Sequence, residues 1–264
     1  MTSADPAVLR ENRQGTVALQ IQRLWASGSV TGLLSPDLGR TPTDDAYSLD
    51  LGATNARTRW MFALGQRVND WLNPQLLLQG GRGQSPQWGL NLAVPLGGAV
   101  VGFAEWAAGS GLGVADAALQ RSAAKRTRHR AALGLTYTTP FDLSITVEAE
   151  TNGAGLSATQ WQALAPMERG AVLAWADAEQ DLPARHALFV HAQWKDVAGS
   201  GLDVAGYLRR EGTTRSRDQW LELRYGWTHT DLALQWQQYS GAGDSIFGAV
   251  PARRTVEVQV RHFF

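Results

Sequence analysis

Residues 255–264 read T-V-E-V-Q-V-R-H-F-F, and residue character alternates strictly along this stretch. One side of an extended chain would carry Val256, Val258, Val260, His262 and Phe264. The other side would carry Thr255, Glu257, Gln259, Arg261 and Phe263. Successive side chains of a β-strand point to opposite faces, so this period of two predicts a strand with one apolar and one polar face.

The same alternation recurs along the whole chain. Its clearest instance is residues 141–150, F-D-L-S-I-T-V-E-A-E, where Phe141, Leu143 and Val147 share one face. Further alternating segments are 16–25, 30–35, 47–52, 57–68, 74–81, 87–94, 98–107, 132–137, 188–195, 202–209, 220–227 and 231–237. Together they predict about 14 antiparallel strands, with a range of about 12 to 16. The one weak amphipathic helical pattern lies near residues 157–178.

A chain that ends on Phe264 directly after an alternating strand resembles the outer-membrane β-barrel proteins of Gram-negative bacteria, the porin-like barrels. The match departs at His262, where those proteins more often carry an aromatic or aliphatic residue. The resemblance implies an all-β fold, an antiparallel transmembrane β-barrel in the outer membrane. It also implies that Val256, Val258, Val260 and Phe264 form the signal for the barrel-assembly machinery, and that outer-membrane lipid and lipopolysaccharide are partners.

The composition agrees with such a barrel. The chain has 264 residues, which suits one barrel domain over 1–264 with an amino-terminal extension at 1–14. Its 24 basic residues balance 24 acidic ones, so nothing points to nucleic acid as a partner. Cysteine is absent, which excludes a disulfide framework and thiolate metal sites. No stretch approaches the roughly 20 apolar residues of a membrane helix.

Residues 1–6 show no basic region followed by an apolar run, so no signal peptide is visible in this chain. Two explanations are equally acceptable: a mature form with an added Met1, or the carboxy-terminal part of a longer barrel.

Connection lengths also follow the barrel pattern in the second half. Short connections at 95–98, 139–142, 196–201 and 228–231 alternate with longer ones at 108–127, 151–184, 211–218 and 241–252. We assign the short ones to the periplasm and the longer ones to the outer surface. The first third deviates, because 26–29 is short where an outer loop is expected and 35–45 is long where a turn is expected.

The polar strand faces carry charges of both signs, which predicts a water-filled pore or channel for small polar solutes. The predicted lumen-lining residues are Asp50, Arg59, Arg130, Glu148, Glu150, Lys195, Arg209, Glu222, Arg224, Glu257 and Arg261. For any single pair among Glu222, Arg224, Glu257 and Arg261 we favour a structural role, pairing across strands to hold register. The alternative function is a closed recognition barrel whose outer loops bind lipopolysaccharide or a partner. A soluble β-rich binding protein is a third possibility.

Other features have competing interpretations. Loops as long as 151–184 are usually functional or disordered. We favour slightly a loop that folds into the barrel and constricts the lumen over a surface lid with a short helix. The cations Lys125, Arg126, Arg128 and Arg130 could hold lipopolysaccharide phosphates, although a solvated loop base is the preferred interpretation. Outward-facing tryptophans predict an aromatic girdle at the membrane interface. They are Trp60, Trp88, Trp194, Trp227 and Trp236.

Catalysis has little support. The five histidines form no HExxH pair or other recognised ligand spacing, and the chain has no GxSxG motif. We therefore expect no enzyme activity, no cofactor and no metal site.

Overall fold

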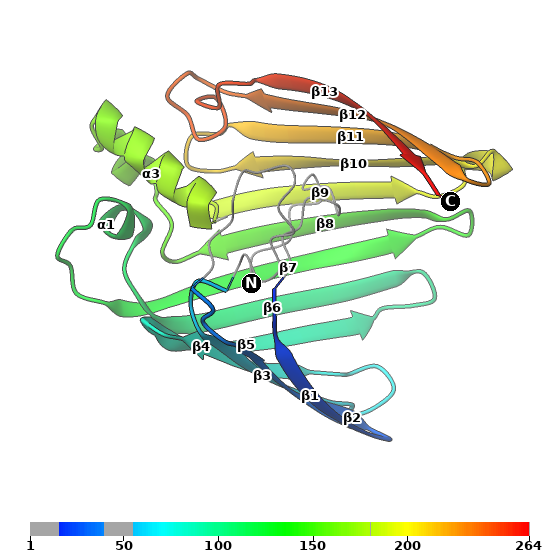
Figure 1. The fold of residues 1–264 in the computed structure, drawn as a ribbon, viewed down its shortest axis with the longest axis horizontal. Coiled ribbons are helices and arrows are strands. Elements are labelled where there is room, and N and C mark those ends of the chain that lie inside the picture. The colour runs from blue at the N-terminus through cyan, green and yellow to red at the C-terminus, as the bar shows by residue number, and fades with distance from the viewer. Residues whose placement is uncertain (1–15, 40–54, 180, 264) are drawn as a thin grey trace. The chain divides into compact units, whose positions relative to one another are not determined.

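The computed structural model describes residues 16–39, 55–179 and 181–263 (Figure 1). Within these ranges, 13 strands form one antiparallel sheet in which each strand pairs with its neighbours in chain order. The strands are β1 (Leu19–Trp25), β2 (Gly28–Ser35), β3 (Arg59–Gln66), β4 (Gln75–Gly81), β5 (Gln84–Pro95), β6 (Val100–Gly111), β7 (Arg126–Thr138), β8 (Leu143–Asn152), β9 (His186–Trp194), β10 (Leu202–Glu211), β11 (Arg217–Gly226), β12 (Thr230–Ser240) and β13 (Arg254–His262). The predicted all-β antiparallel fold is confirmed, and the strand number falls within the expected range.

The described residues contain few helices, and these are short. They are α1 (Val114–Ala118), α2 (Ala158–Gln162), α3 (Pro166–Glu179) and the 3-10 turn η2 (Val197–Gly199). The weak helical pattern near 157–178 thus corresponds to α2 and α3. No helix among the described residues is both long and apolar enough to cross a membrane.

In the first third, the strand predicted at 47–52 lies outside the described residues. Strand β2 pairs directly with β3, with Ser35 opposite Arg59, so no strand stands between them in the sheet. In this order the turn 26–27 follows an odd-numbered strand, as do the short connections 96–99, 139–142 and 227–229. The long connection 36–58 follows an even-numbered strand.

The chain divides into two compact units. Unit 1 comprises Met1–Val94, Glu105–Gly111 and Lys125–His129. At one end of its sheet, the fully buried Asn55 joins two strands. Its Nδ2 lies 2.8 Å from the carbonyl oxygens of Val17 and Pro36 and from Ser35 Oγ, and its Oδ1 accepts from the backbone N–H of Val17. One amide side chain therefore holds the segment before β1 against the end of β2.

Unit 2 comprises Pro95–Ala104, Leu112–Ala124 and Arg130–Phe264. Its strands show burial that is inverted relative to a soluble sheet. Val258 lies opposite Leu234, and Leu234 lies opposite Leu223, so these apolar side chains form a row across β11–β13. Yet Val258 is 64% exposed, whereas Asp218 and Gln235 on the opposite face are 3% and 6% exposed. The apolar face therefore faces outward from the protein, and the polar face is covered.

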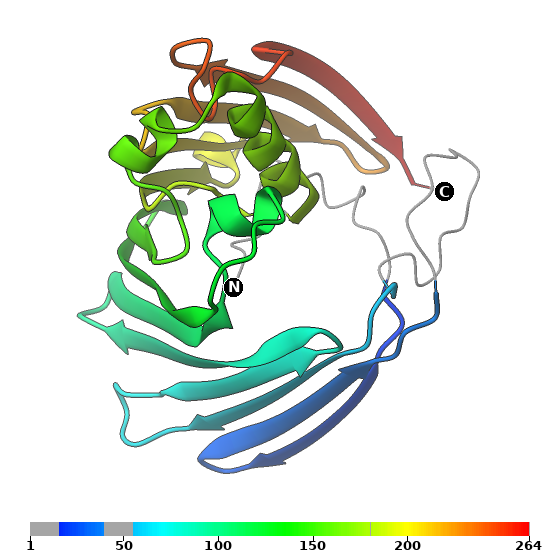
Figure 2. The same cartoon turned by 90° about the vertical axis from the view of Figure 1, so that its left-hand side faces the viewer.

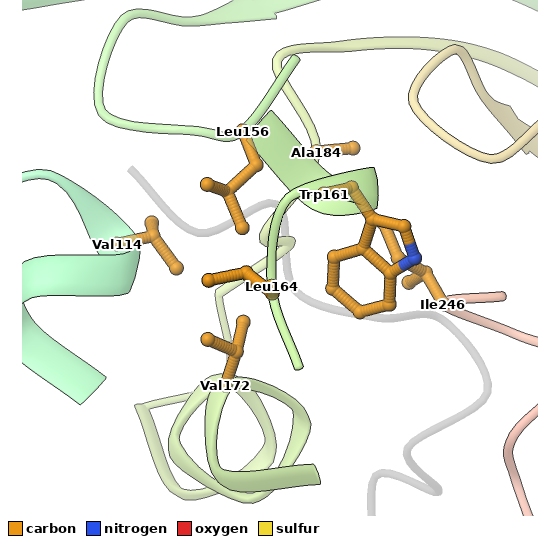
Figure 3. Packing of buried hydrophobic residues seen from close by; sticks show 7 residues of the cluster. All are labelled: Val114, Leu156, Trp161, Leu164, Val172, Ala184 and Ile246. Carbon is orange, nitrogen blue, oxygen red and sulfur yellow. The ribbon is translucent and has the colours of Figure 1, made fainter. Parts of the chain in front are cut away.

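The buried apolar cluster of unit 2 lies among the connections (Figure 3). Its members are Val114, Leu156, Trp161, Leu164, Val172, Ala184 and Ile246. They come from α1, from the segment between β8 and β9, and from the connection between β12 and β13. Helices α1 and α3 lie side by side (Figure 2). Gly155 allows the segment after β8 to approach the segment before β9, because a Cβ there would lie 2.3 Å from the carbonyl oxygen of Ala184. We call this folded group of connections the loop assembly.

Two predicted connections are wrong in extent. The segment 108–127 was expected to be a loop, but β6 continues to Gly111 and β7 begins at Arg126. The segment 211–218 was expected to be a long outer loop, but only 212–216 separate β10 from β11. Alternation continues through Asp218 and Trp220, and the intervening turn is shortened by the side chain of Glu211, described below.

Candidate functional site

The polar face of unit 2 brings together charged residues from several strands. Strand register places Glu148 opposite Phe189, Phe189 opposite Arg209, and Arg209 opposite Asp218, which makes one row across β8–β11. Nearer the short turns, Asp203 lies opposite Arg224 and Asp231 lies opposite Arg261. Acidic and basic groups therefore lie opposite one another on several pairs of neighbouring strands of this face.

Glu222 and Arg224 form an ion pair along β11. Arg224 Nε donates to Glu222 Oε1 at 3.1 Å, and Arg224 Nη2 donates to Glu222 Oε2 at 3.2 Å. Gln235 Nε2 on β12 donates to Glu222 Oε2 at 2.6 Å. Both carboxylate oxygens are occupied, so the pair joins β11 to β12 in a fixed register. Glu257 lies opposite Gln235 and completes the row on β13.

A second polar group was missed from the sequence. Tyr207 Oη on β10 donates to Asp218 Oδ2 on β11 at 2.8 Å, and Gln237 Nε2 on β12 donates to Asp218 Oδ1 at 3.2 Å. The Tyr207 ring stacks on Trp220, with centroids 5.7 Å apart. Asp218 falls in the predicted connection 211–218, although it belongs to β11 and continues the alternation of that strand.

Glu211 is fully buried at the end of β10 and organises the turn 212–216. Its carboxylate accepts from the backbone N–H groups of Thr213, Thr214 and Ser216 at 2.7 to 2.9 Å, and from the hydroxyls of Thr214 and Ser216. Those hydroxyls then accept from the backbone of Ile246 and Phe247. Thr213 Oγ1 donates to the carbonyl of Leu156. A single carboxylate therefore joins three connections.

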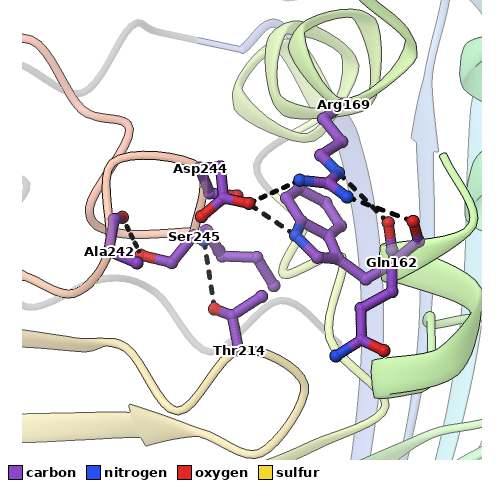
Figure 4. Close-up of polar contacts among 8 residues, drawn as sticks. Gln162, Arg169, Thr214, Ala242, Asp244 and Ser245 are labelled. Carbon is purple, nitrogen blue, oxygen red and sulfur yellow. Dashed lines mark hydrogen bonds and ion pairs between the residues drawn. The ribbon is translucent and has the colours of Figure 1, made fainter. Parts of the chain in front are cut away.

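Arg169 joins α3 to the connection 241–253 (Figure 4). It forms an ion pair with Asp244 Oδ2 at 2.5 Å, and it donates to the carbonyl oxygens of Trp161 and Gln162. The indole N–H of Trp161 donates to the backbone carbonyl of Asp244 at 3.1 Å. The loop assembly is thus held by polar contacts around its apolar cluster.

Two more ion pairs attach α3 and its flanks. Arg130, on the polar face of β7, pairs with Asp181 just after α3. Arg121 pairs with Glu168 in the first turn of α3. The hydrogen bond from the Ala165 backbone N–H lowers the pKa of Glu168, and Arg121 lowers it further. Glu168 is therefore a carboxylate at neutral pH.

The remaining predicted residues fall in several places. Arg59 lies on the same face of β3 as the buried Ala63, and Glu150 lies on β8 opposite Ala187. Lys195 lies just past β9, at the beginning of the short connection 195–201. Asp50 and Phe264 lie outside the described residues.

The tryptophans predicted to form an aromatic girdle differ in exposure. Trp88 and Trp227 are strongly exposed, while Trp60, Trp194 and Trp236 are partly covered. Trp161 is buried in the loop assembly, and Met167 is exposed.

The described residues contain no group of three or more His, Asp or Glu side chains that could hold a metal ion.

Comparison with solved structures identifies the fold. Two Pseudomonas aeruginosa proteins match over 94% of this chain: OccK10 (OpdN), with 14% identity, a TM-score of 0.58 and 72% of its chain covered, and OccK5 (OpdH), with 9% identity, a TM-score of 0.57 and 71% covered. OccK8 (OprE) from the same organism matches over 94% of this chain and 70% of its own, at 12% identity and a TM-score of 0.55. The chain has the porin fold. No protein-family model and no curated protein matches the porin-fold chain by sequence.

Proposed function

We propose that this porin-fold chain is an outer-membrane channel that passes small polar solutes. The observation that carries the proposal is the inverted burial of unit 2. Leu133, Val256 and Val260 expose 64 to 67% of their surface on one face, while ionisable side chains occupy the other. An exposed apolar surface of this extent suits lipid, and a strand face rich in opposed charges suits water.

In this proposal the polar faces line the pore. The lining residues are Arg59, Arg130, Glu148, Glu150, Arg209, Glu222, Arg224, Glu257 and Arg261, with Lys195 at the end of β9 and Asp50 carried over from the sequence. Their charges have fixed partners in several cases, Glu222 with Arg224 and Arg130 with Asp181. The fixed pairs hold the wall in place, and the charges along it act on passing ions.

We further propose that the segment 153–185 narrows the passage. Within this segment, Asp181 forms an ion pair with Arg130. Arg130 lies on the polar face of β7, whereas Leu133 on the same strand lies on the outward apolar face. The segment is thereby attached to the polar face of the sheet. Replacing Asp181 with Asn should loosen the end of this segment at the polar face and increase the single-channel conductance, while Glu179→Asn at the exposed end of α3 should leave the conductance unchanged.

The main test is single-channel recording of the detergent-refolded chain in a planar bilayer. Repeatable current steps would support the channel. Silence after insertion has been verified by protease protection would contradict it and favour a closed recognition barrel. Failure to insert, with stability in buffer without detergent, would contradict the membrane location as well.

Ion selectivity offers a sharper version of this test. Glu150 Oε1 is buried on the polar face of β8 and has no hydrogen-bond partner among the described residues. Glu150→Gln should shift the reversal potential in a salt gradient toward anion preference. Glu179→Gln removes the same charge from the exposed end of α3 and should shift it far less. Equal shifts would contradict the assignment of Glu150 to the pore wall.

A further inference from the structure

A group of arginines gathers at the loop end of β10–β13, on and beside the outward apolar face. Arg210 on β10 lies directly opposite Arg217 on β11. Arg254, the first residue of β13, lies opposite Gln238 on β12, and Gln238 lies opposite Gln219 on β11. Arg215 and Arg253 stand in the adjoining connections. We call these five exposed residues the arginine patch.

The patch has no acidic counterpart within the described part of the chain. None of its five side chains forms an ion pair or a side-chain hydrogen bond with a described residue. The nearby acids are engaged elsewhere: Glu211 is buried within its own turn, Asp218 accepts from Tyr207 on the opposite face, and Asp244 pairs with Arg169.

This arrangement is unfavourable for the protein alone. Like charges directly opposite one another on neighbouring antiparallel strands repel, because their Cβ atoms lie about 5 Å apart. Arg210 and Arg217 are in this position. An anion that bridges the two guanidinium groups would remove the repulsion, and guanidinium groups match phosphate oxygens in a bidentate geometry.

The surface next to the patch indicates which anion. Along β10 the outward face changes from Leu208 to Arg210, and along β13 it changes from Val256 to Arg254. Leu208 and Val256 are both exposed. An amphiphile whose acyl chains lie on the apolar face would therefore place its headgroup at the arginines.

We propose that the arginine patch binds the phosphorylated headgroup of a membrane lipid at the outer interface of the bilayer. This inference rests on the membrane location proposed above and is independent of conduction. It also moves the lipid-phosphate hypothesis away from Lys125–Arg130. In that segment Arg130 is paired with Asp181, and Arg128 has a partner of its own.

The test measures binding of bisphosphorylated lipid A to the full chain in neutral detergent, by native mass spectrometry at stepped lipid concentrations. Arg210→Gln/Arg217→Gln/Arg254→Gln should weaken binding about 10- to 100-fold, since each basic residue near a membrane surface contributes appreciably to lipid affinity. The matched control is Arg23→Gln/Arg57→Gln/Arg67→Gln, which removes three exposed arginines elsewhere and should bind as the unmodified protein does.

Two further comparisons guard against a folding defect and an unspecific ion site. The triple Arg→Lys variant at 210, 217 and 254 keeps the charge but loses the bidentate guanidinium geometry, so its binding should lie between that of the Gln triple and that of the unmodified protein. Dephosphorylated lipid A should bind all proteins weakly. Equal binding by the Gln triple and the unmodified protein would overturn the proposal. Displacement of lipid A by an equal concentration of inorganic phosphate would also overturn it, because the patch would then hold free phosphate.

The outcome is separable from the channel test. A protein that conducts but shows no arginine-dependent lipid binding would contradict the lipid site alone. A silent protein that binds lipid A through the patch would contradict the channel alone.

Discussion

Tyr207 and Asp218, from neighbouring strands of the polar face, share a buried hydrogen bond of 2.8 Å. Tyr207 is 5% exposed, so its hydroxyl and the carboxylate meet away from bulk water. The same carboxylate accepts from Gln237 on the next strand, which makes Asp218 the link among β10, β11 and β12.

Removing the Tyr207 hydroxyl should therefore destabilise this part of the sheet. We expect Tyr207→Phe to lower the free energy of unfolding by about 1 to 3 kcal/mol, because a buried carboxylate oxygen loses a donor. Urea unfolding in detergent, followed by tryptophan fluorescence, measures the change. Tyr225→Phe on the exposed face of β11 is the matched control and should change stability by less than about 0.5 kcal/mol. Similar losses in both variants would contradict a special role for the buried bond.

The contact between Arg169 and Asp244 should hold the connection 241–253 against α3. Asp244→Asn removes the ion pair but leaves the backbone carbonyl that accepts from Trp161. Limited proteolysis within 241–253 should become several-fold faster, since a partly exposed ion pair contributes about 0.2 to 1 kcal/mol. Combining Asp244→Asn with Trp161→Phe should accelerate cleavage further. An unchanged rate in the double variant would show that the apolar cluster alone holds the connection.

The first turn of α3 should respond to acid. The pKa of Glu168 is lowered in the folded protein, so the contribution of this group is fully present above its ordinary pKa of 4.5 and is lost as the pH falls through the lowered value. Proteolysis near α3 with an acid-active protease should accelerate below about pH 4.5 in the unmodified protein. Glu168→Gln should already be fast at neutral pH and show a weaker dependence. Identical pH profiles would assign the acid response to other groups.

The two strand faces should differ in their tolerance of charge. Val147 is exposed on the apolar face, and the adjacent Thr146 lies on the polar face, where its hydroxyl meets that of Thr136 at 2.8 Å. Val147→Arg should destabilise the inserted protein by about 2 to 4 kcal/mol if it lies near the bilayer midplane. Thr146→Arg should cost about 1 kcal/mol, the value of one hydrogen bond. Refolding into lipid vesicles at increasing urea compares the two, and equal costs would contradict the assignment of faces.

Much of the strand pattern could be predicted from local order. Segments such as 141–150 and 255–262 alternate strictly; the second is a strand throughout, and the first is a strand from Leu143 onward, with 141 and 142 in the turn before it. The errors occur where local order is weak or interrupted. Residues 211–218 contain charged and hydroxyl groups typical of a loop, yet Glu211 shortens them to a tight turn by accepting hydrogen bonds from residues that follow it. The strand predicted at 47–52 lies outside the described residues and stays a prediction, and β2 pairs directly with β3.

The candidate site divides in the same way. Charges on the polar faces, among them Glu148, Glu222 and Arg224, were predictable because the face of a strand residue depends only on its position in the alternation. The partners of those charges were not predictable, since Asp181 reaches Arg130 and Asp244 reaches Arg169 across connections of unknown path.

By itself the sequence determined where most of the strands lie and which face their residues occupy, because both follow from a period of two along a local stretch of chain. It also determined the antiparallel all-β class. The tertiary structure alone decided which strands are neighbours, how the connections pack into the loop assembly, and that Arg210 and Arg217 face one another. Those features depend on the register between distant segments and on burial, and local alternation carries no information about either.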